Sequence, residues 1–280
     1  MVTPKIKRLK MLQRRNGDVS ERRGMHIYIL PNLFTTGNMF CGFLSMIKSL
    51  EGDFLLAAYF IVAAAVFDAL DGRVARFTQA TSKFGMEYDS LSDLISFGVA
   101  PAFLMYLWAL RPFERIGYLA AFMYMACTAL RLARFNVQAA SVEKKFFQGL
   151  PSPMAGGIVA TSVTAAYATG FDPLGNIYAL SMTALLGFVM VSNFRYRSFK
   201  ELDFRHRKPF FGLIIGLCIL IFIAIKPEVH LFIAFISYAV LGAVLGVLSP
   251  ARRKISQVIV AESARRHGLS QEALEDGPKE

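Results

Sequence analysis

Apolar residues run along this chain in long segments separated by short polar linkers. A helix needs about 20 mainly apolar residues to cross a bilayer, and about eight segments approach that length. They are Ile27–Ile47, Phe54–Ala75, Leu91–Leu110, Ile116–Val137, Met154–Gly170, Ile177–Asn193, Pro209–Ile225 and Val229–Leu248. Only a helix satisfies all its backbone hydrogen bonds within one such segment. The pattern therefore predicts an all-α integral membrane protein with about eight transmembrane helices.

Composition agrees with this prediction. Of the 280 residues, 55% are hydrophobic and only 18% are charged, against about 25% charged in an average soluble protein. These values exclude a disordered chain and an ordinary soluble domain. The three cysteines, Cys41, Cys127 and Cys218, all fall inside apolar segments. They are typical of small buried residues and do not suggest a disulfide framework.

Charge then predicts the orientation. The net charge of +11 would suggest nucleic acid in a soluble protein. Here the charges lie between apolar segments, so we expect contact with anionic membrane lipids and no nucleic-acid partner. If successive helices alternate, most of the 31 basic residues share the side of the N-terminus, and the other side keeps Lys48, Arg111, Arg115 and Lys226. This asymmetry predicts a multi-pass protein of the cytoplasmic membrane with both termini in the cytoplasm.

Four regions follow from these patterns. Residues 1–26 form a basic cytoplasmic segment, for which a surface helix on anionic lipid and a disordered tail are both compatible. Residues 27–200 hold the first six predicted helices, and residues 201–250 hold two more. Residues 251–280 form a cytoplasmic tail.

Four aspartates interrupt the apolar pattern. Asp68 and Asp71 are three residues apart at the end of the second predicted helix, and Asp89 and Asp93 are four apart at the start of the third. Both spacings place a pair on one helix face. Because the two helices form a hairpin, we expect the four carboxylates to converge at the cytoplasmic side.

Ionisable groups at membrane depth are costly and usually functional. Four adjacent carboxylates would repel one another, and divalent cations with a preference for oxygen ligands, Mg²⁺ or Mn²⁺, would relieve that repulsion. The alternative is that these residues cap helices or pair with Arg73 and Arg76. The neighbouring Gly72 and Gly85 favour the metal interpretation, because glycine lets a backbone approach a phosphate or sugar closely.

The stretch from Asp68 to Asp93 matches the pattern D-x2-D-G-x2-A-R-x8-G-x3-D-x3-D at every fixed position. It resembles the signature of the CDP-alcohol phosphatidyltransferase family. The resemblance implies that residues 27–200 form that family's six-helix catalytic core, with the last two helices as additions. It also implies a homodimer.

The resemblance further implies roles for single residues. Asp68, Asp71 and Asp89 would hold two divalent cations, Mg²⁺ or Mn²⁺, and Asp93 would complete the second metal site and act as the general base. Contacts with the CDP-linked lipid would come from Gly72, Arg76, Ser82, Gly85, Pro31, Asn32 and Thr35. The polar residues after Pro31 could equally cap the first helix. Many family members carry arginine where this chain has Asn38, so no role is carried over there.

Three arginines could bind the alcohol that accepts the transferred group. Arg131 and Arg134 share one face of the fourth helix, level with the aspartates, and Arg195 follows the sixth. Each could instead extend its side chain to the interface. The segments around them and after Pro31 resemble the phosphatidylserine synthase branch of the family. That branch transfers a phosphatidyl group from CDP-diacylglycerol to L-serine and releases CMP. The arginines would bind the serine carboxylate or a lipid phosphate.

Two alternatives remain at this point. The acceptor could be glycerol 3-phosphate or an inositol phosphate, which would need more basic residues in the pocket. The aspartates could also form the ion site of a cation transporter. That hypothesis predicts a polar pathway across the bilayer, and helices five to eight contain no deep ionisable residue to continue one.

Overall fold

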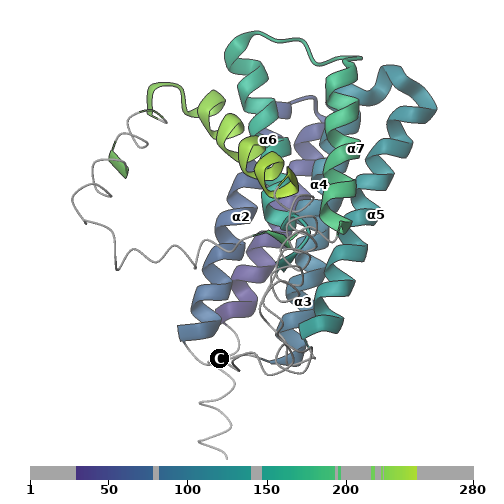
Figure 1. Cartoon of the computed structure of the whole chain (residues 1–280). Coiled ribbons are helices and arrows are strands. Elements are labelled where there is room, and N and C mark those ends of the chain that lie inside the picture. The colour runs from purple at the N-terminus through teal and green to yellow at the C-terminus, as the bar shows by residue number, and fades with distance from the viewer. Residues whose placement is uncertain are drawn as a thin grey trace, which may run out of the picture.

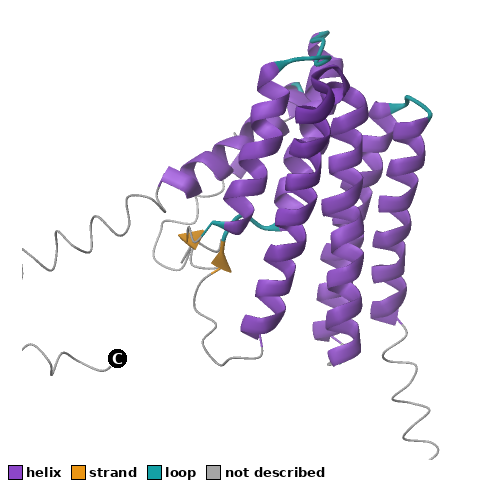
Figure 2. Cartoon of the chain, turned by 90° about the vertical axis from the view of Figure 1, so that its right-hand side faces the viewer, coloured by secondary structure: helices purple, strands orange, loops and turns teal. Residues whose placement is uncertain are grey.

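The protein is a bundle of helices packed side by side (Figures 1 and 2). The computed structural model describes residues 30–77, 82–139, 147–192, 195–196, 216–217, 222 and 224–244. A helix over residues 30–50 precedes α2 (Phe54–Phe77), α3 (Lys83–Asp93), η1 (Leu94–Val99), α4 (Ala100–Met105), η2 (Tyr106–Leu110), η3 (Arg111–Phe113), α5 (Glu114–Ala139), α6 (Ser152–Thr169) and α7 (Ile177–Val191). A further helix covers Pro227–Val244. The all-α prediction is confirmed.

One small sheet departs from pure helix. Strands β1 (Phe147–Gln148) and β2 (Arg195–Tyr196) pair antiparallel, with Phe147 opposite Tyr196 and Gln148 opposite Arg195. The pair lies beside the helices in Figure 2. It joins the chain after α5 to the chain after α7, two segments in which hydropathy predicted only linkers.

The third predicted helix begins earlier than its apolar run indicated. The chain is continuously helical from Lys83 to Leu110, through α3, η1, α4 and η2. The apolar segment was predicted to begin at Leu91, because Lys83, Glu87 and Asp89 interrupt the apolar pattern before it. Ser82 instead starts α3 as its N-cap, with its hydroxyl accepting from Gly85 N. Both η1 and η2 are π-helical turns, for which hydropathy has no signal.

Helix α6 is the most deeply buried helix of the described bundle, although its sequence, rich in Ala, Gly and Thr, is less hydrophobic than that of α7. Nearly every residue from Ser152 to Ala166 is buried, and α6 packs mainly against α2 and η1 (Figure 1). At Gly156 a β-carbon would lie only 3.0 Å from the Phe97 ring. Small side chains allow such close helix packing in a membrane, which explains the low hydropathy.

The membrane-crossing prediction is supported over part of the chain. Three stretches of the described residues are long and apolar enough to span a bilayer, namely Phe54–Phe77, Lys83–Gln138 and Pro227–Val244. Helix α7 is apolar but shorter. Most of the seventh predicted span, residues 209–225, lies outside the described residues, as do segments 1–26 and 251–280. The count of eight spans stays a prediction.

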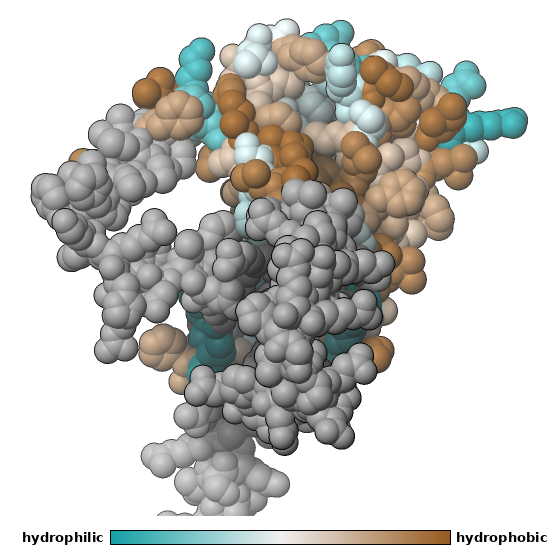
Figure 3. All heavy atoms as spheres, in the orientation of Figure 1, coloured by the Kyte–Doolittle hydropathy of each residue, from teal (hydrophilic) through white to brown (hydrophobic). Residues whose placement is uncertain are grey.

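Large apolar side chains lie on the outside of the bundle, where a soluble protein would be polar. Examples on α5 and α7 are Ile116, Leu119, Phe122, Leu185 and Phe188, all more than half exposed. In Figure 3 apolar side chains (brown) gather on the upper part of the coloured surface and along its right-hand edge. An exposed apolar surface of this extent fits contact with lipid tails.

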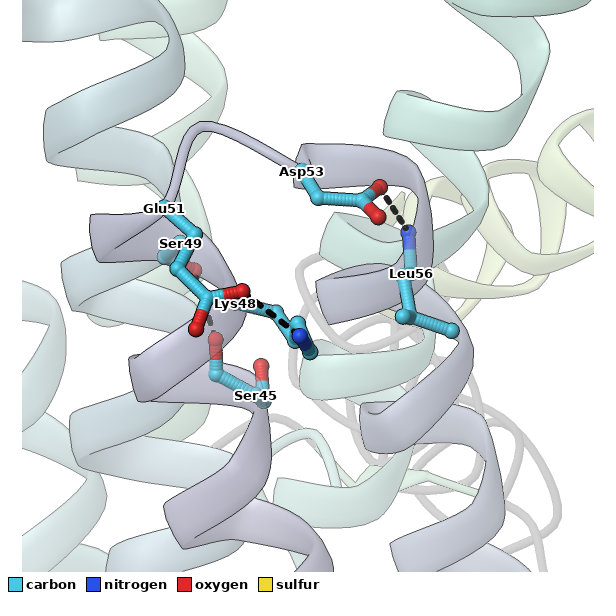
Figure 4. A network of polar contacts seen from close by, with 6 residues as sticks. All are labelled: Ser45, Lys48, Ser49, Glu51, Asp53 and Leu56. Atoms are coloured by element: carbon cyan, nitrogen blue, oxygen red, sulfur yellow. Dashed lines mark hydrogen bonds and ion pairs between the residues drawn. The ribbon is translucent and has the colours of Figure 1, made fainter.

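The turn between the first helix and α2 is held by local polar contacts (Figure 4). Lys48 and Glu51 form an ion pair of 2.6 Å, and the Ser49 hydroxyl donates to the Ser45 carbonyl at 2.8 Å. Asp53 caps α2, with its carboxylate accepting from Leu56 N at 3.1 Å. This turn lies at the opposite end of α2 from Asp68 and Asp71. Lys48, one of the four basic residues predicted on the side of the bilayer opposite the N-terminus, is thus paired with an acidic residue.

Candidate active site

Helices α2 and α3 bring the predicted aspartates together at one end of the bundle, the lower end in Figure 1. One carboxylate oxygen from each of Asp68, Asp71 and Asp89 lies within 4.8 Å of the others. Asp68 and Asp71 belong to α2 and Asp89 belongs to α3, so two separate helices supply the cluster. Three oxygens at this separation can surround one small cation.

The donor set fits a divalent metal. In addition to the close oxygens, Asp89 Oδ1 is buried and has no hydrogen-bond partner among the described residues. A buried carboxylate oxygen without a donor is costly, and a bound cation would satisfy it. The chemistry matches Mg²⁺ or Mn²⁺, which bind carboxylates together with phosphate oxygens.

Asp71 is held by the first helix. The Thr35 hydroxyl lies 3.0 Å from Asp71 Oδ2 and donates to it. The same hydroxyl lies 3.2 Å from the Pro31 carbonyl. Thr35 is 4% exposed and Asp71 is 5% exposed, so this contact is shielded from water. Thr35 was predicted near the nucleotide, and the structure adds a contact with an aspartate.

Asp93 lies close enough to Asp68 and Asp89 for their charges to interact. Asp93 is 8% exposed. Its Oδ1 accepts a hydrogen bond of 3.2 Å from Asn38 Nδ2. It is the last residue of α3, directly before the π turn η1. π turns inside α-helices occur frequently at functional sites.

A cavity of about 420 Å³ opens beside the aspartates, between the first helix, α2 and α3. Its lining residues are Pro31, Asn32, Thr35, Asp71, Gly72, Ala75, Ser82, Lys83, Gly85, Met86 and Asp89. Six of the seven residues predicted to contact the CDP-lipid are among them. Ala75, Lys83 and Met86 line the cavity without having been predicted, although Ala75 is a fixed position of the signature.

The two glycines of the cavity differ in their surroundings. A β-carbon at Gly72 would meet nothing within 4 Å, whereas one at Gly85 would lie 3.1 Å from Ser82 Oγ. Gly72 therefore leaves open space in the wall. At Gly85 the backbone N–H donates to Ser82 Oγ at 2.9 Å, and the missing side chain gives that hydroxyl room to approach. The role of Ser82 in this structure is to cap α3.

Arg76 is the predicted contact that the cavity lining does not include. Its Nε donates to the Gly72 carbonyl at 2.8 Å, on an exposed part of α2. The side chain thus folds back along its own helix, one turn toward the cavity. Its terminal nitrogens remain close to the rim at Gly72.

Hydrogen bonds hold α3 from both sides. On one side Ser92 Oγ donates to the Thr35 carbonyl at 2.9 Å, and the hydroxyls of Thr36 and Tyr88 lie 2.9 Å apart. On the other side Asn136 Nδ2 donates to Glu87 at 3.0 Å. Sequence reasoning missed these residues. The sequence signal that could have identified them is the presence of a polar side chain inside or beside an apolar segment.

Comparison with known proteins adds a decisive observation. A family model described as CDP-alcohol phosphatidyltransferase matches residues 28–196, more than half of the chain. The chain belongs to the CDP-alcohol phosphatidyltransferase family. The resemblance seen in the signature is thereby confirmed.

Several curated proteins of this family are similar in sequence to this chain. The chain is 41% identical over 177 residues to a CDP-diacylglycerol–serine O-phosphatidyltransferase of Helicobacter pylori, covering 62% of this chain and 74% of the relative. It is 36% identical over 173 residues to a protein of the same name from Bacillus subtilis, covering 61% and 92%. It is 38% identical over 169 residues to an archaetidylserine synthase of Methanothermobacter thermautotrophicus, covering 60% and 69%.

Within this family member, the three predicted arginines have different surroundings. Arg131 is buried, and its Nη1 donates to Ser152 Oγ at 2.8 Å. Its Nε is buried without a partner among the described residues, and its charge is close enough to act on Asp93. An unsatisfied donor beside the aspartates is available to an anionic group.

Arg134 instead binds the end of α7. Its Nη1 donates to the Val191 carbonyl at 2.9 Å, and its Nη2 lies 3.4 Å from the carbonyls of Met190 and Ser192. A cation at a helix C-terminus satisfies the last carbonyls and stabilises the helix dipole. Arg195 pairs through its backbone in β2, and its side chain lies outside the described part of the structure.

Proposed function

We propose that this chain transfers a phosphatidyl group from CDP-diacylglycerol to the hydroxyl group of L-serine, giving phosphatidylserine and CMP. The observation that carries the proposal is the convergence of Asp68, Asp71 and Asp89 at the edge of the cavity. The names of the curated relatives support serine as the acceptor. The product would make this a phospholipid-synthesising enzyme.

The donor would occupy the cavity between the first helix, α2 and α3. Gly72 leaves room for a nucleotide or phosphate against the backbone, and Pro31, Asn32 and Gly85 form neighbouring parts of the wall. Lys83 at the start of α3 adds a positive charge on the same wall. Arg76 would reach the donor from the rim at Gly72. The lipid tails would extend into the bilayer.

Asp68, Asp71, Asp89 and Asp93 would hold divalent cations, Mg²⁺ or Mn²⁺, and we propose two per site. When bound, such cations stabilise the negative charge of the pyrophosphate and of the leaving CMP. The orphaned oxygen of Asp89 and the short separations among three carboxylates support this role. Thr35 would keep the Asp71 carboxylate turned toward the group.

In the transfer, the serine oxygen forms a bond to the lipid-linked phosphorus, and the bond from that phosphorus to the CMP oxygen breaks. Asp93 would accept the proton of the serine hydroxyl, as a general base must lie within reach of the proton it takes. Arg131 would hold the serine carboxylate through its unpartnered Nε. Nothing further is assigned to Arg134 or Arg195 in this step.

The positive-inside pattern supports a site on the cytoplasmic face of the cytoplasmic membrane, with both termini on that side. CMP and serine are water-soluble, so this face would also give them access. A homodimer remains the expectation from the family. Vesicle-reconstituted protein probed with an impermeant cysteine or lysine reagent would test the orientation.

The test of function is CMP release by purified protein with CDP-diacylglycerol and Mn²⁺ or Mg²⁺. Serine, glycerol 3-phosphate and an inositol phosphate are added one at a time, with Asp93→Asn as the inactive control. We expect release only with serine and its loss in the control. Release with another acceptor alone would overturn the serine assignment. Metal binding without release for any acceptor would favour a cation transporter.

A further inference from the structure

Asn38 has a fully buried side chain in the first helix, inside an apolar segment. Its amide makes one hydrogen bond within the described structure, from Nδ2 to Asp93 Oδ1 at 3.2 Å. Its Oδ1 is buried with no partner among the described residues. An apolar residue of similar size would fill the position without leaving a buried oxygen unsatisfied. Packing alone therefore does not account for the amide.

The position of Asn38 is itself fixed. Its backbone carbonyl accepts a hydrogen bond from Ser96 Oγ at 2.9 Å. One turn further along, a β-carbon at Gly42 would lie 2.6 Å from Ser96 Oγ, so the first helix and η1 touch closely. The amide is thus presented to Asp93 from a rigid contact between two helical elements. A rigid partner can impose an orientation on the side chain that it binds.

Asp93 needs such a partner because its other neighbour is a carboxylate. Asp68 is close enough to Asp93 for the two charges to interact, and neighbouring carboxylates repel each other unless a proton or a cation lies between them. The Asn38 donor binds one oxygen of Asp93, Oδ1, and not the other. A neutral amide does this without adding a charge that would compete with a cation or a proton for the same oxygens.

We propose that Asn38 is a positioning residue that holds the Asp93 carboxylate beside Asp68, in the orientation required for metal binding and for proton removal from the acceptor. The inference rests on the proposed function for its kinetic consequence. Its consequence for metal binding stands independently of which acceptor is used. Asn38 acts through Asp93 and makes no contact with substrate in this account.

The main variant is Asn38→Leu, which keeps the approximate volume and removes the amide. We expect kcat for serine-dependent CMP release to fall roughly 10- to 100-fold, the scale of a misplaced catalytic group, with KM for CDP-diacylglycerol little changed. We expect Mn²⁺ affinity, measured by calorimetry without substrates, to fall about 10-fold or more, as for loss of other residues that orient metal ligands. The thermal midpoint should change little, because losing the unsatisfied Asn38 Oδ1 and losing the donor to Asp93 Oδ1 act in opposite directions.

Ser49→Ala is the matched control, since it removes a buried hydrogen bond at the other end of the first helix and does not touch Asn38 or Asp93. We expect it to lower the thermal midpoint while kcat and Mn²⁺ affinity stay near wild type. A purely structural role for Asn38 predicts the reverse for Asn38→Leu, with lower stability and unchanged turnover per folded molecule. Asn38→Ala serves as the second variant if leucine is not accommodated.

A double-mutant cycle with Asp93→Asn completes the test. If Asn38 acts through Asp93, Asn38→Leu adds no further loss of Mn²⁺ affinity in the Asp93→Asn background. Additive losses would overturn the proposal. If the wild-type protein releases no CMP with any acceptor but Asn38→Leu still weakens Mn²⁺ binding, the proposed function fails and the role of Asn38 stands.

Discussion

The hydroxyl of Tyr124 on α5 donates a hydrogen bond of 3.1 Å to the backbone carbonyl of Phe97 in η1. Pro101 lies four residues after Phe97 and has no N–H, so this carbonyl lacks its normal α-helical donor. Tyr124 is fully buried, and its hydroxyl supplies the missing donor from another helix. This contact fastens α5 to the π turn that follows Asp93.

We therefore expect Tyr124→Phe to lower the free energy of unfolding by about 1–3 kcal/mol, the cost of leaving a buried polar group unsatisfied. The thermal midpoint in detergent measures the change. Tyr118→Phe, on the same helix but 49% exposed, is the control and should leave the midpoint unchanged. Equal midpoints for the two variants would contradict this account of Tyr124.

Removal of metal should abolish activity, and a single carboxylate should control metal affinity. We expect Asp89→Asn to weaken Mn²⁺ binding by roughly 10-fold or more, because it replaces an anionic oxygen ligand by a neutral one. CMP release should stop in EDTA and return when Mn²⁺ is added. Asp53→Asn makes the same chemical change at the other end of α2, and Mn²⁺ titration should show wild-type affinity. Unchanged affinity in Asp89→Asn would exclude this residue as a ligand.

Gly42 marks a contact that cannot accept a side chain. A β-carbon there would lie 2.8 Å from Ser96 Cα, a backbone atom that cannot move aside alone. We expect Gly42→Ala to cost about 1–3 kcal/mol of stability, as for other overpacked contacts. It should also slow CMP release, because the same helix carries Thr35 and Asn38. Gly216→Ala, with nothing within 4 Å of the new β-carbon, is the comparison, and similar losses in both would argue against the contact.

Two neighbouring arginines should give opposite phenotypes. Arg134→Met removes the hydrogen bonds to the last carbonyls of α7, so the thermal midpoint should fall while KM for serine stays constant. Arg131→Met should raise KM for serine about 10-fold, the effect of losing one charged hydrogen bond of about 1.4 kcal/mol or more. Steady-state kinetics and thermal unfolding of both variants separate the roles. A raised KM in Arg134→Met would reverse the assignment.

Much of the site could be predicted from the sequence because its chemistry lies in short spacings. Asp68 and Asp71, and then Asp89 and Asp93, follow helical periodicity, so each pair lies on one face of its helix. Gly72 and Gly85 lie next to these aspartates in the sequence, and the group that crowds Gly85 is Ser82, three residues before it. These features depend on residues within about one or two helical turns, so a linear pattern captures them.

Other features depend on partners far away in the chain. Asn38 and Asp93 are 55 residues apart, and Arg134 meets α7 across 57 residues. Hydropathy predicted α6 as a span but not its depth of burial, because the scale describes the polarity of side chains and not their packing against other helices. The early start of α3 depended on a cap at Ser82, outside the apolar run that defined the span.

The π turn at η1 has one further consequence. A π turn contains one residue more than an α-helix would use over the same rise, so it rotates everything after it by about 100° relative to an unbroken helix. Deleting one residue between Leu94 and Val99 would restore regular winding while turning Asp93 away from Asn38 or Trp108 away from the core. The extra residue thus sets the rotation of the helix after η1 relative to the helix before it, so that Asp93 and Trp108 both face their partners. In a chain with one residue fewer in this turn, we expect either the contact of Asp93 with Asn38 or the burial of Trp108 in the core to be lost.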